Sequence, residues 1–241
     1  MRDIAIIDYG RFGKLAAFHL KKKATIFVFD KKVISSRQRG IEFVSLEEAA
    51  SKKHIILSVP INQLERTIRK ISPFLKPGSI VYDVCSVKEQ PCKWMRKHLP
   101  KSVSIIGTHP LFGPDSAKDS LKQRNIALCP VRANRERIRK TDAFLRSLKL
   151  NVRLMKPDEH DRLMAQTLFL TQFICRGLND FPLPETPFTT MNYRFLKQII
   201  ETTNNDSVEL FKDMFRYNRF ARTIPQEFLR DFQKLMRTLP K

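Results

Sequence analysis

The chain is poor in acidic residues, in cysteines and in long apolar segments. No apolar run approaches the length of a membrane-spanning helix, and no charged segment followed by an apolar one marks a secretion signal. We therefore expect a cytoplasmic protein with no membrane partner. The four cysteines lack the paired spacing of a metal site, so we expect reduced thiols and no bound metal.

The scarcity of acidic residues leaves the chain strongly basic. Aspartates and glutamates number 24 against 45 lysines and arginines, which gives a formal net charge of +21. Clustered basic residues would indicate nucleic-acid binding, but here they are spread over the whole length, without an aromatic RNA-binding signature or a helix-turn-helix. A basic solvated surface is the simpler interpretation, and nucleic-acid binding stays an alternative that the charge alone motivates.

The length of 241 residues, with 42% hydrophobic content, can bury one large core or two modest ones. Strand-like and helix-like segments alternate until about residue 155, which is typical of an α/β fold with a doubly wound sheet. From Pro157 onward the periodicity is helical and no strand is evident. We predict a Rossmann-type domain over residues 1–155 and a smaller all-helical domain over residues 156–241, which docks on the first domain or forms a homodimer.

A glycine-containing turn follows the first expected strand. Residues 4–7 are apolar and lead into Asp8-Tyr9-Gly10-Arg11-Phe12-Gly13, after which the pattern is helical. This order is typical of a dinucleotide site, where Gly10 lets the backbone approach the pyrophosphate and Gly13 lets the helix pack closely on the strand. Asp8 replaces the usual first glycine and would repel a pyrophosphate, which Arg11 can offset, so we expect weakened binding. A βαβ unit that binds no nucleotide is the alternative.

A second apolar run, residues 24–29, ends at Asp30, twenty residues after Gly10. At this spacing a carboxylate can accept both ribose hydroxyls of NAD, so we predict NAD as the cofactor, while Lys31 and Lys32 leave NADP possible. The expected strand over residues 54–59 ends beside the same turn. The predicted cofactor-binding residues are Asp8, Gly10, Arg11, Phe12, Gly13, Asp30, Ser58, Val59 and Pro60.

The candidate catalytic residues follow two further strands. The apolar run 104–106 leads into the segment GTHPLFGPDS, which delivers His109 to the end of a strand, where an imidazole can act as a general base. The run 79–84 leads into Ser86 and Lys88 at the same edge of the sheet. Ser86 can instead be a helix N-cap, and a single histidine is commonly a packed or surface residue.

These segments together resemble the prephenate and arogenate dehydrogenases of tyrosine biosynthesis, over nearly the whole chain. The resemblance includes IIDYGRFGKLAA, DVCSVK and GTHPLFGPDS, and in the C-terminal part EHDRLMAQTLFLTQF, TPFTTMNYRFL and NNDSVELFKDMFRYN. The histidine segment together with Ser-Val-Lys is specific to this family among related dehydrogenases. The C-terminal segments look closer to the arogenate-type members.

The resemblance implies an NAD(P)-dependent oxidative decarboxylation of arogenate or prephenate, without a metal. His109 would accept the hydroxyl proton and Ser86 would share that hydrogen bond. Lys88 and Arg176 are candidates for the substrate carboxylates, unless they form surface ion pairs, and Asp115 is expected near the substrate entrance. Gln172 stands where relatives usually have a histidine, which leaves the choice of substrate open. Asp8 and Gln172 also motivate an alternative, a catalytically impaired relative that binds NAD.

Overall fold

The computed structural model describes residues 2–32 and 39–240. The chain divides into two compact units, of which the first ends at His160 and the second begins at Asp161. Within the described residues, no helix combines the length and the apolar character needed to cross a membrane.

The first unit contains one eight-stranded sheet in the order β3-β2-β1-β4-β5-β6-β7-β8. Neighbouring strands are parallel, except that β7 runs antiparallel to β6. From β1 the chain adds β2 and β3 on one side and β4 to β8 on the other. The point between β1 and β4 is therefore the switch point at which ligands bind in doubly wound sheets. The predicted fold class is confirmed, while the reversal at β7 was not predicted. The strands are β1 (Asp3–Ile7), β2 (Thr25–Phe29), β3 (Ile41–Phe43), β4 (His54–Leu57), β5 (Ile80–Asp83), β6 (Ser104–Pro110), β7 (Asn125–Arg132) and β8 (Asn151–Leu154).

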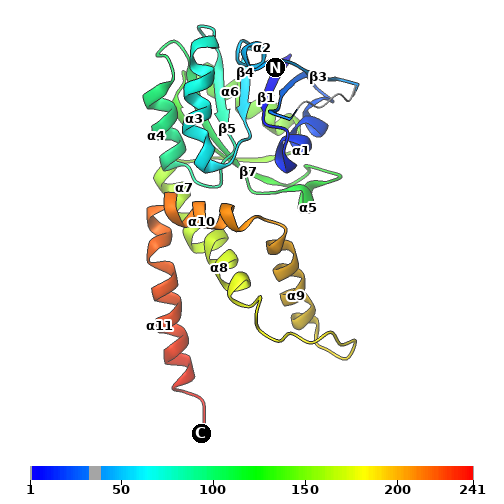
Figure 1. Cartoon of the computed structure of the whole chain (residues 1–241), viewed down its shortest axis with the longest axis vertical. Helices are drawn as coiled ribbons and strands as arrows, with labels where there is room; N and C mark the ends of the chain where they lie inside the picture. Colours follow the sequence, from blue (N-terminus) through cyan, green and yellow to red (C-terminus); the bar gives the residue numbers. More distant parts are fainter. Residues whose placement is uncertain (1, 33–38, 241) are drawn as a thin grey trace. The chain divides into compact units, whose positions relative to one another are not determined.

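Helices cover both faces of this sheet (Figure 1). On one face lie α1 (Arg11–Leu20) and α6 (Arg135–Ser147), whose apolar side chains pack against alternate residues of the strands. On the other lie α2 (Leu46–Ala50), α3 (Ile61–Ile71) and α4 (Glu89–His98), which contact one another in that order. The buried residues Leu64, Ile68 and Ile71 of α3 recur at helical spacing, which explains why this segment forms an amphipathic helix. Two short helical segments complete the unit, η1 (Ser72–Phe74) and α5 (Pro114–Ala117).

A cavity of about 90 Å³ lies between the sheet and the layer formed by α1 and α6. Its lining is mostly apolar, and Leu15, Leu121 and Leu145 belong to it. Thr108 and Pro110 line it too, from the two positions that flank His109 on β6. Because side chains alternate along a strand, His109 points to the opposite face of the sheet.

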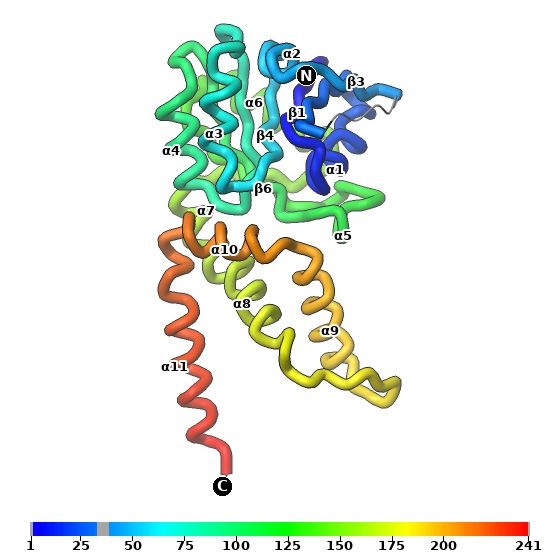
Figure 2. The backbone as a smooth tube through the Cα atoms, viewed as in Figure 1, coloured from blue at the N-terminus to red at the C-terminus, as the bar shows by residue number. Residues whose placement is uncertain are grey.

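The second unit is helical, as predicted, and Figure 2 follows its path from α8 to the C-terminus. The first helical stretch changes its winding, since α7 (Pro157–Met164) passes into the π-helical η2 (Ala165–Phe169) and then into α8 (Leu170–Gly177). The next helices are α9 (Met191–Asn204) and α10 (Val208–Tyr217), followed by η3 (Arg219–Arg222). The last described helix is α11 (Ile224–Met236), in which Phe228, Phe232 and Leu235 have helical spacing.

The core of the second unit is aromatic. Phe169 stacks on Phe211 with ring centroids 5.3 Å apart, and it also contacts Phe173 and Phe215. The π-helical turn therefore places one buried ring against both α8 and α10. By contrast, α11 leaves apolar side chains exposed, with Leu229, Phe232, Leu235 and Met236 between 52% and 61% accessible.

Candidate active site

The turn between β1 and α1 has the geometry of a dinucleotide-binding turn. Asp8 adopts a φ of 82°, in the left-handed region that glycine prefers and aspartate tolerates. A Cβ atom on Gly13 would lie 2.2 Å from the carbonyl oxygen of Asp8, so only glycine allows α1 to start this close to β1. Gly10 is the N-cap of α1, and Arg11 and Phe12 are its first two residues. These four positions form the close-packed helix N-terminus that the sequence predicts.

Asp30 follows β2 and fixes the same turn. Its Oδ2 accepts a hydrogen bond from the backbone N–H of Tyr9, and its Oδ1 accepts one from that of Lys32, both at 2.7 Å. Burial and the charge of Asp30 raise the pKa of the Asp8 carboxyl above its usual value. Two carboxylates therefore lie near each other at the end of β1 and β2.

The residues after β4 lie beside this turn. The backbone N–H of Ser58 donates to the carbonyl oxygen of Ile7 at 2.9 Å, and Pro60 is the N-cap of α3. Ser58 Oγ lies 3.5 Å from the position of a Cβ on Gly13. In the described part of the chain this hydroxyl is buried without a hydrogen-bond partner. Val59 is buried.

A second contact joins α1 to α5. Arg11 Nη2 forms an ion pair with Asp115, 2.9 Å from Oδ2, and the rings of Phe12 and Phe112 lie 6.3 Å apart. Arg11, a predicted cofactor-binding residue, thus contacts Asp115, a predicted substrate-binding residue. The segment that follows His109 is therefore held against the start of α1 by an ion pair and an aromatic contact, and His19 Nε2 of α1 lies 2.9 Å from the carbonyl oxygen of Ala117 in α5.

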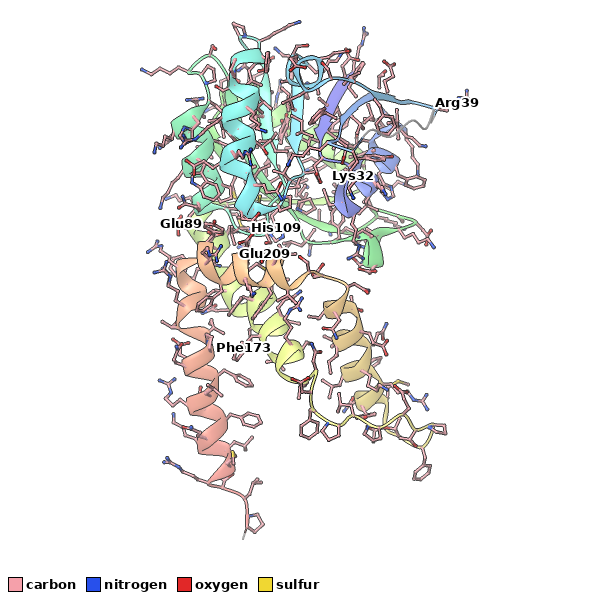
Figure 3. All side chains as sticks on the ribbon, viewed as in Figure 1. Lys32, Arg39, Glu89, His109, Phe173 and Glu209 are labelled. Atoms are coloured by element: carbon pink, nitrogen blue, oxygen red, sulfur yellow. The ribbon has the colours of Figure 1, made fainter. Side chains whose placement is uncertain are left out.

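His109, labelled in Figure 3, lies near the end of β6 and is 6% exposed. Its Nδ1 is 2.8 Å from Nε2 of His160, which lies in α7 and belongs to the same unit. Burial, His160 and the charge of Lys88 hold the pKa of His109 well below its usual value. The imidazole is therefore neutral near pH 7, the protonation state that a general base needs. His160 was missed as a site residue, although it begins the segment HDRLMAQ.

Lys88 does not lie at a surface. Its side chain is completely buried, and its Nζ donates to the carboxylate of Asp83 and, at 2.6 Å, to the carbonyl oxygen of Thr108. Burial by itself lowers the pKa of Lys88, but Asp83 outweighs it, together with Cys85 and Cys92, and the net pKa is raised. The ammonium group is thus charged and bound to the end of β5 and to the residue before His109, instead of facing a substrate carboxylate as the sequence suggested.

Ser86 lies in the turn between β5 and α4, and its hydroxyl is buried without a partner within the described residues. The alternative of an N-cap is not borne out, because Lys88 holds the N-cap position of α4. A buried hydroxyl with an unused hydrogen-bonding capacity is a group that a ligand can satisfy.

Gln172 and Arg176, the remaining predicted substrate residues, contact each other in α8. Arg176 Nε donates to Gln172 Oε1 at 3.0 Å, and Gln172 Nε2 donates to the carboxylate of Asp206 at 2.9 Å. Arg176 also donates to the backbone carbonyl of Asp206 at 2.8 Å. These bonds tie α8 to the turn between α9 and α10.

Part of the chain matches two family models. Residues 17–154 match the model for the prephenate dehydrogenase nucleotide-binding domain, and residues 178–241 match the model for the TYRAAT1-like C-terminal domain. Within the described residues, no group of three or more His, Cys, Asp or Glu side chains is placed to hold a metal ion.

Known proteins are similar over most of the chain. A probable arogenate/prephenate dehydrogenase of Methanocaldococcus jannaschii is 28% identical over 92% of this chain and 53% of its own length. Arogenate dehydrogenase 1, chloroplastic, of Arabidopsis thaliana is 30% identical over 96% of this chain and 38% of its own length. The chain therefore spans about half or less of the length of these relatives.

Solved structures share the fold. Prephenate dehydrogenase from Aquifex aeolicus superimposes with a TM-score of 0.77 at 19% identity, covering 98% of this chain and 90% of that one. Arogenate dehydrogenase from Synechocystis superimposes with a TM-score of 0.72 at 21% identity, covering 97% and 90%.

Proposed function

Because this chain belongs to the prephenate dehydrogenase family, we propose that it catalyses the NAD(P)-dependent oxidative decarboxylation of arogenate or prephenate. In this proposal residues 1–155 bind the dinucleotide, and residues 156–241 contribute to substrate binding and to a homodimer. The observation that carries it is the pair formed by neutral His109 and His160 at the end of β6.

Three features support a dinucleotide at the turn between β1 and α1. The missing Cβ of Gly13, the left-handed backbone at Asp8 and the unpartnered hydroxyl of Ser58 all fit a bound nucleotide. Amide groups at the start of α1 would bind the pyrophosphate, and Asp30 would accept the ribose hydroxyls through its remaining lone pairs. The similar structure from A. aeolicus contains NAD+ and hydroxyphenyl propionate. When bound, the nicotinamide supplies the hydride acceptor.

His109 is the proposed proton acceptor. With its own proton on Nδ1, donated to His160 Nε2, the neutral ring keeps a lone pair on Nε2 for the hydroxyl proton of the substrate. As that proton moves, the ring carbon becomes a carbonyl carbon, hydride leaves it, and loss of carbon dioxide makes the ring aromatic. Ser86 would share the hydrogen bond to the substrate hydroxyl through its buried Oγ.

Roles for the other predicted residues follow from their contacts. Lys88 would hold the backbone next to His109 instead of binding a substrate carboxylate, since its Nζ is bonded to Thr108 and Asp83. Gln172 and Arg176 would shape the substrate side of the second unit, and Asp115 would control the entrance through its pair with Arg11.

The test is an assay of purified protein with NAD or NADP and either arogenate or prephenate, followed by the absorbance of the reduced cofactor. We expect turnover with one substrate and loss of it in His109→Asn. His98→Asn, which changes a histidine bonded to Glu65 away from this site, should keep full activity. Folded protein that binds NAD but turns over neither substrate would instead favour the catalytically impaired relative.

The proposed homodimer would form through α11. This helix has a row of exposed apolar side chains, including Phe232 at 52% and Leu235 at 56% exposure, which a second copy can cover. Light scattering should give a dimer mass for the natural chain and a monomer mass for Phe232→Glu. A monomer at micromolar concentration in both cases would disprove this interface.

A further inference from the structure

The chain places one of its own carboxylates at the expected phosphate position. Asp8 Oδ2 accepts a hydrogen bond from the backbone N–H of Gly10 at 3.3 Å, next to the start of α1. A Cβ atom on Gly10 would lie 3.0 Å from the same oxygen, so the carboxylate fills the space above this glycine. Backbone amides at a helix N-terminus bind anions, and here the anion is part of the protein.

The surrounding charges make this arrangement dependent on protonation. Burial disfavours a charge on Asp8 and Asp30, which follows β2, repels it, so both raise the pKa of Asp8, whereas the Gly10 amide and Lys31 favour the charge. Arg11, the first residue of α1, is paired with Asp115 on α5. A diphosphate arriving at this turn would add further negative charge beside Asp8 and Asp30.

We propose that the Asp8 carboxylate is an internal occupant of the phosphate position, and that a dinucleotide binds there with uptake of one proton by Asp8. The inference rests on the proposed function, because it assumes that the turn is the cofactor site. Neutral Asp8 no longer repels the diphosphate and can donate a hydrogen bond to it. Affinity for a diphosphate therefore falls as the pH rises, while affinity for a ligand without phosphate does not.

Calorimetric titration of the full chain with ADP, adenosine and NAD tests this inference. For the natural chain we expect the Kd for NAD, whose diphosphate carries no proton that ionises in this range, to rise at least tenfold between pH 6 and pH 8. Titrations in two buffers of different ionisation enthalpy should show uptake of close to one proton per NAD at pH 7.5. Asp8→Asn should lower the Kd for NAD and for ADP at pH 8 at least tenfold, and it should remove both the pH dependence and the proton uptake of NAD binding. The Kd for adenosine should change less than twofold.

The variants separate charge from damage to the fold. Asparagine keeps the shape of the side chain and tolerates the left-handed backbone, and Asp8→Gly, which restores the usual glycine, should bind ADP as tightly as Asp8→Asn. Asp142→Asn removes one negative charge on α6, where Asp142 pairs with Arg146, and should bind ADP like the natural chain.

Three outcomes would overturn the inference. Equal affinity of the natural chain and Asp8→Asn for ADP would show that the carboxylate does not compete. Tighter binding by Asp8→Asn without proton uptake would show that Asp8 moves aside while still charged. In both cases binding of NAD would leave the proposed function intact. If neither the natural chain nor the Asp8 variants bind NAD or NADP, the inference and the cofactor assignment fail together.

Discussion

Lys88 and Asp83 form an ion pair in which neither side chain has any exposure to solvent, at the carboxyl end of β5. The same ammonium group donates to the carbonyl oxygen of Thr108, the residue before His109. A buried charge pair therefore connects the strand that ends before Ser86 to the strand that presents the histidine.

Lys88→Met should destabilise the protein by about 3–5 kcal/mol, because it leaves the Asp83 carboxylate buried and unpaired. The double variant Lys88→Met, Asp83→Leu should lose less stability than Lys88→Met, since no buried charge is left without a partner. Urea unfolding of both variants at pH 7 measures the difference. A double variant that is less stable than Lys88→Met would contradict this account of the pair.

His160→Leu should lower kcat by at least about tenfold, less than the loss of about 10²–10⁴-fold expected for His109→Asn. Leucine cannot accept the Nδ1 proton of His109, so the tautomer with a free Nε2 is no longer favoured. The natural enzyme should lose activity only as the pH falls well below the ordinary histidine pKa, because the pKa of His109 is lowered. In His160→Leu the pKa of His109 should rise, so that activity is lost at a higher pH than in the natural chain. His160→Gln should recover part of kcat. An unchanged pH profile in His160→Leu would exclude the positioning role.

Gly13→Ala should abolish binding of ADP and destabilise the first unit by more than about 1 kcal/mol. The new methyl group would lie 2.2 Å from a backbone oxygen, and backbone cannot move aside as a flexible side chain can. Gly177→Ala is the matched control, because a Cβ there meets no atom within 4 Å. It should stabilise α8 slightly, by about 0.5–1 kcal/mol. Thermal unfolding with and without ADP compares the two.

His54 should make the folded state sensitive to acid. Its Nδ1 lies 3.2 Å from the hydroxyl of Tyr82, and its pKa is lowered to about 4, mainly by burial, with Lys53 contributing. The unfolded chain then binds more protons than the folded one, so stability is lost as the pH falls from 6.5 towards 4. His54→Gln cannot titrate, and its free energy of unfolding should fall less over that range. Urea titrations at pH 7 and pH 4.5 measure the free energy of unfolding of both proteins. An equal loss of stability in the natural chain and in His54→Gln would show that His54 is not the cause.

The sequence was enough to place several candidate site residues along the strands. The turn from Asp8 to Gly13, Asp30 after β2 and His109 near the end of β6 all follow from apolar runs that end at polar residues. Because parallel strands end at a common edge, these runs were enough to put the residues at the same edge of the sheet.

Contacts between distant segments could not be predicted in this way. His160 lies 51 residues after His109, and only the return of α7 to the sheet brings the two rings together. Lys88 looked like a ligand for substrate carboxylates because the sequence does not show that its side chain is buried, where it binds Asp83 and the carbonyl oxygen of Thr108, twenty residues away. The antiparallel direction of β7 likewise depends on the path of the chain after α5, which hydrophobic periodicity does not report.

The cavity between the sheet and α1 gives the first unit a response to compression. Empty space inside a folded protein disappears when the chain unfolds, so hydrostatic pressure favours unfolding wherever such space exists. The part of this cavity of about 90 Å³ that excludes water adds to the volume lost on unfolding. Pressure should therefore loosen the layer of α1 against β1, and a partly opened layer of this kind would expose the back of the strand that holds His109.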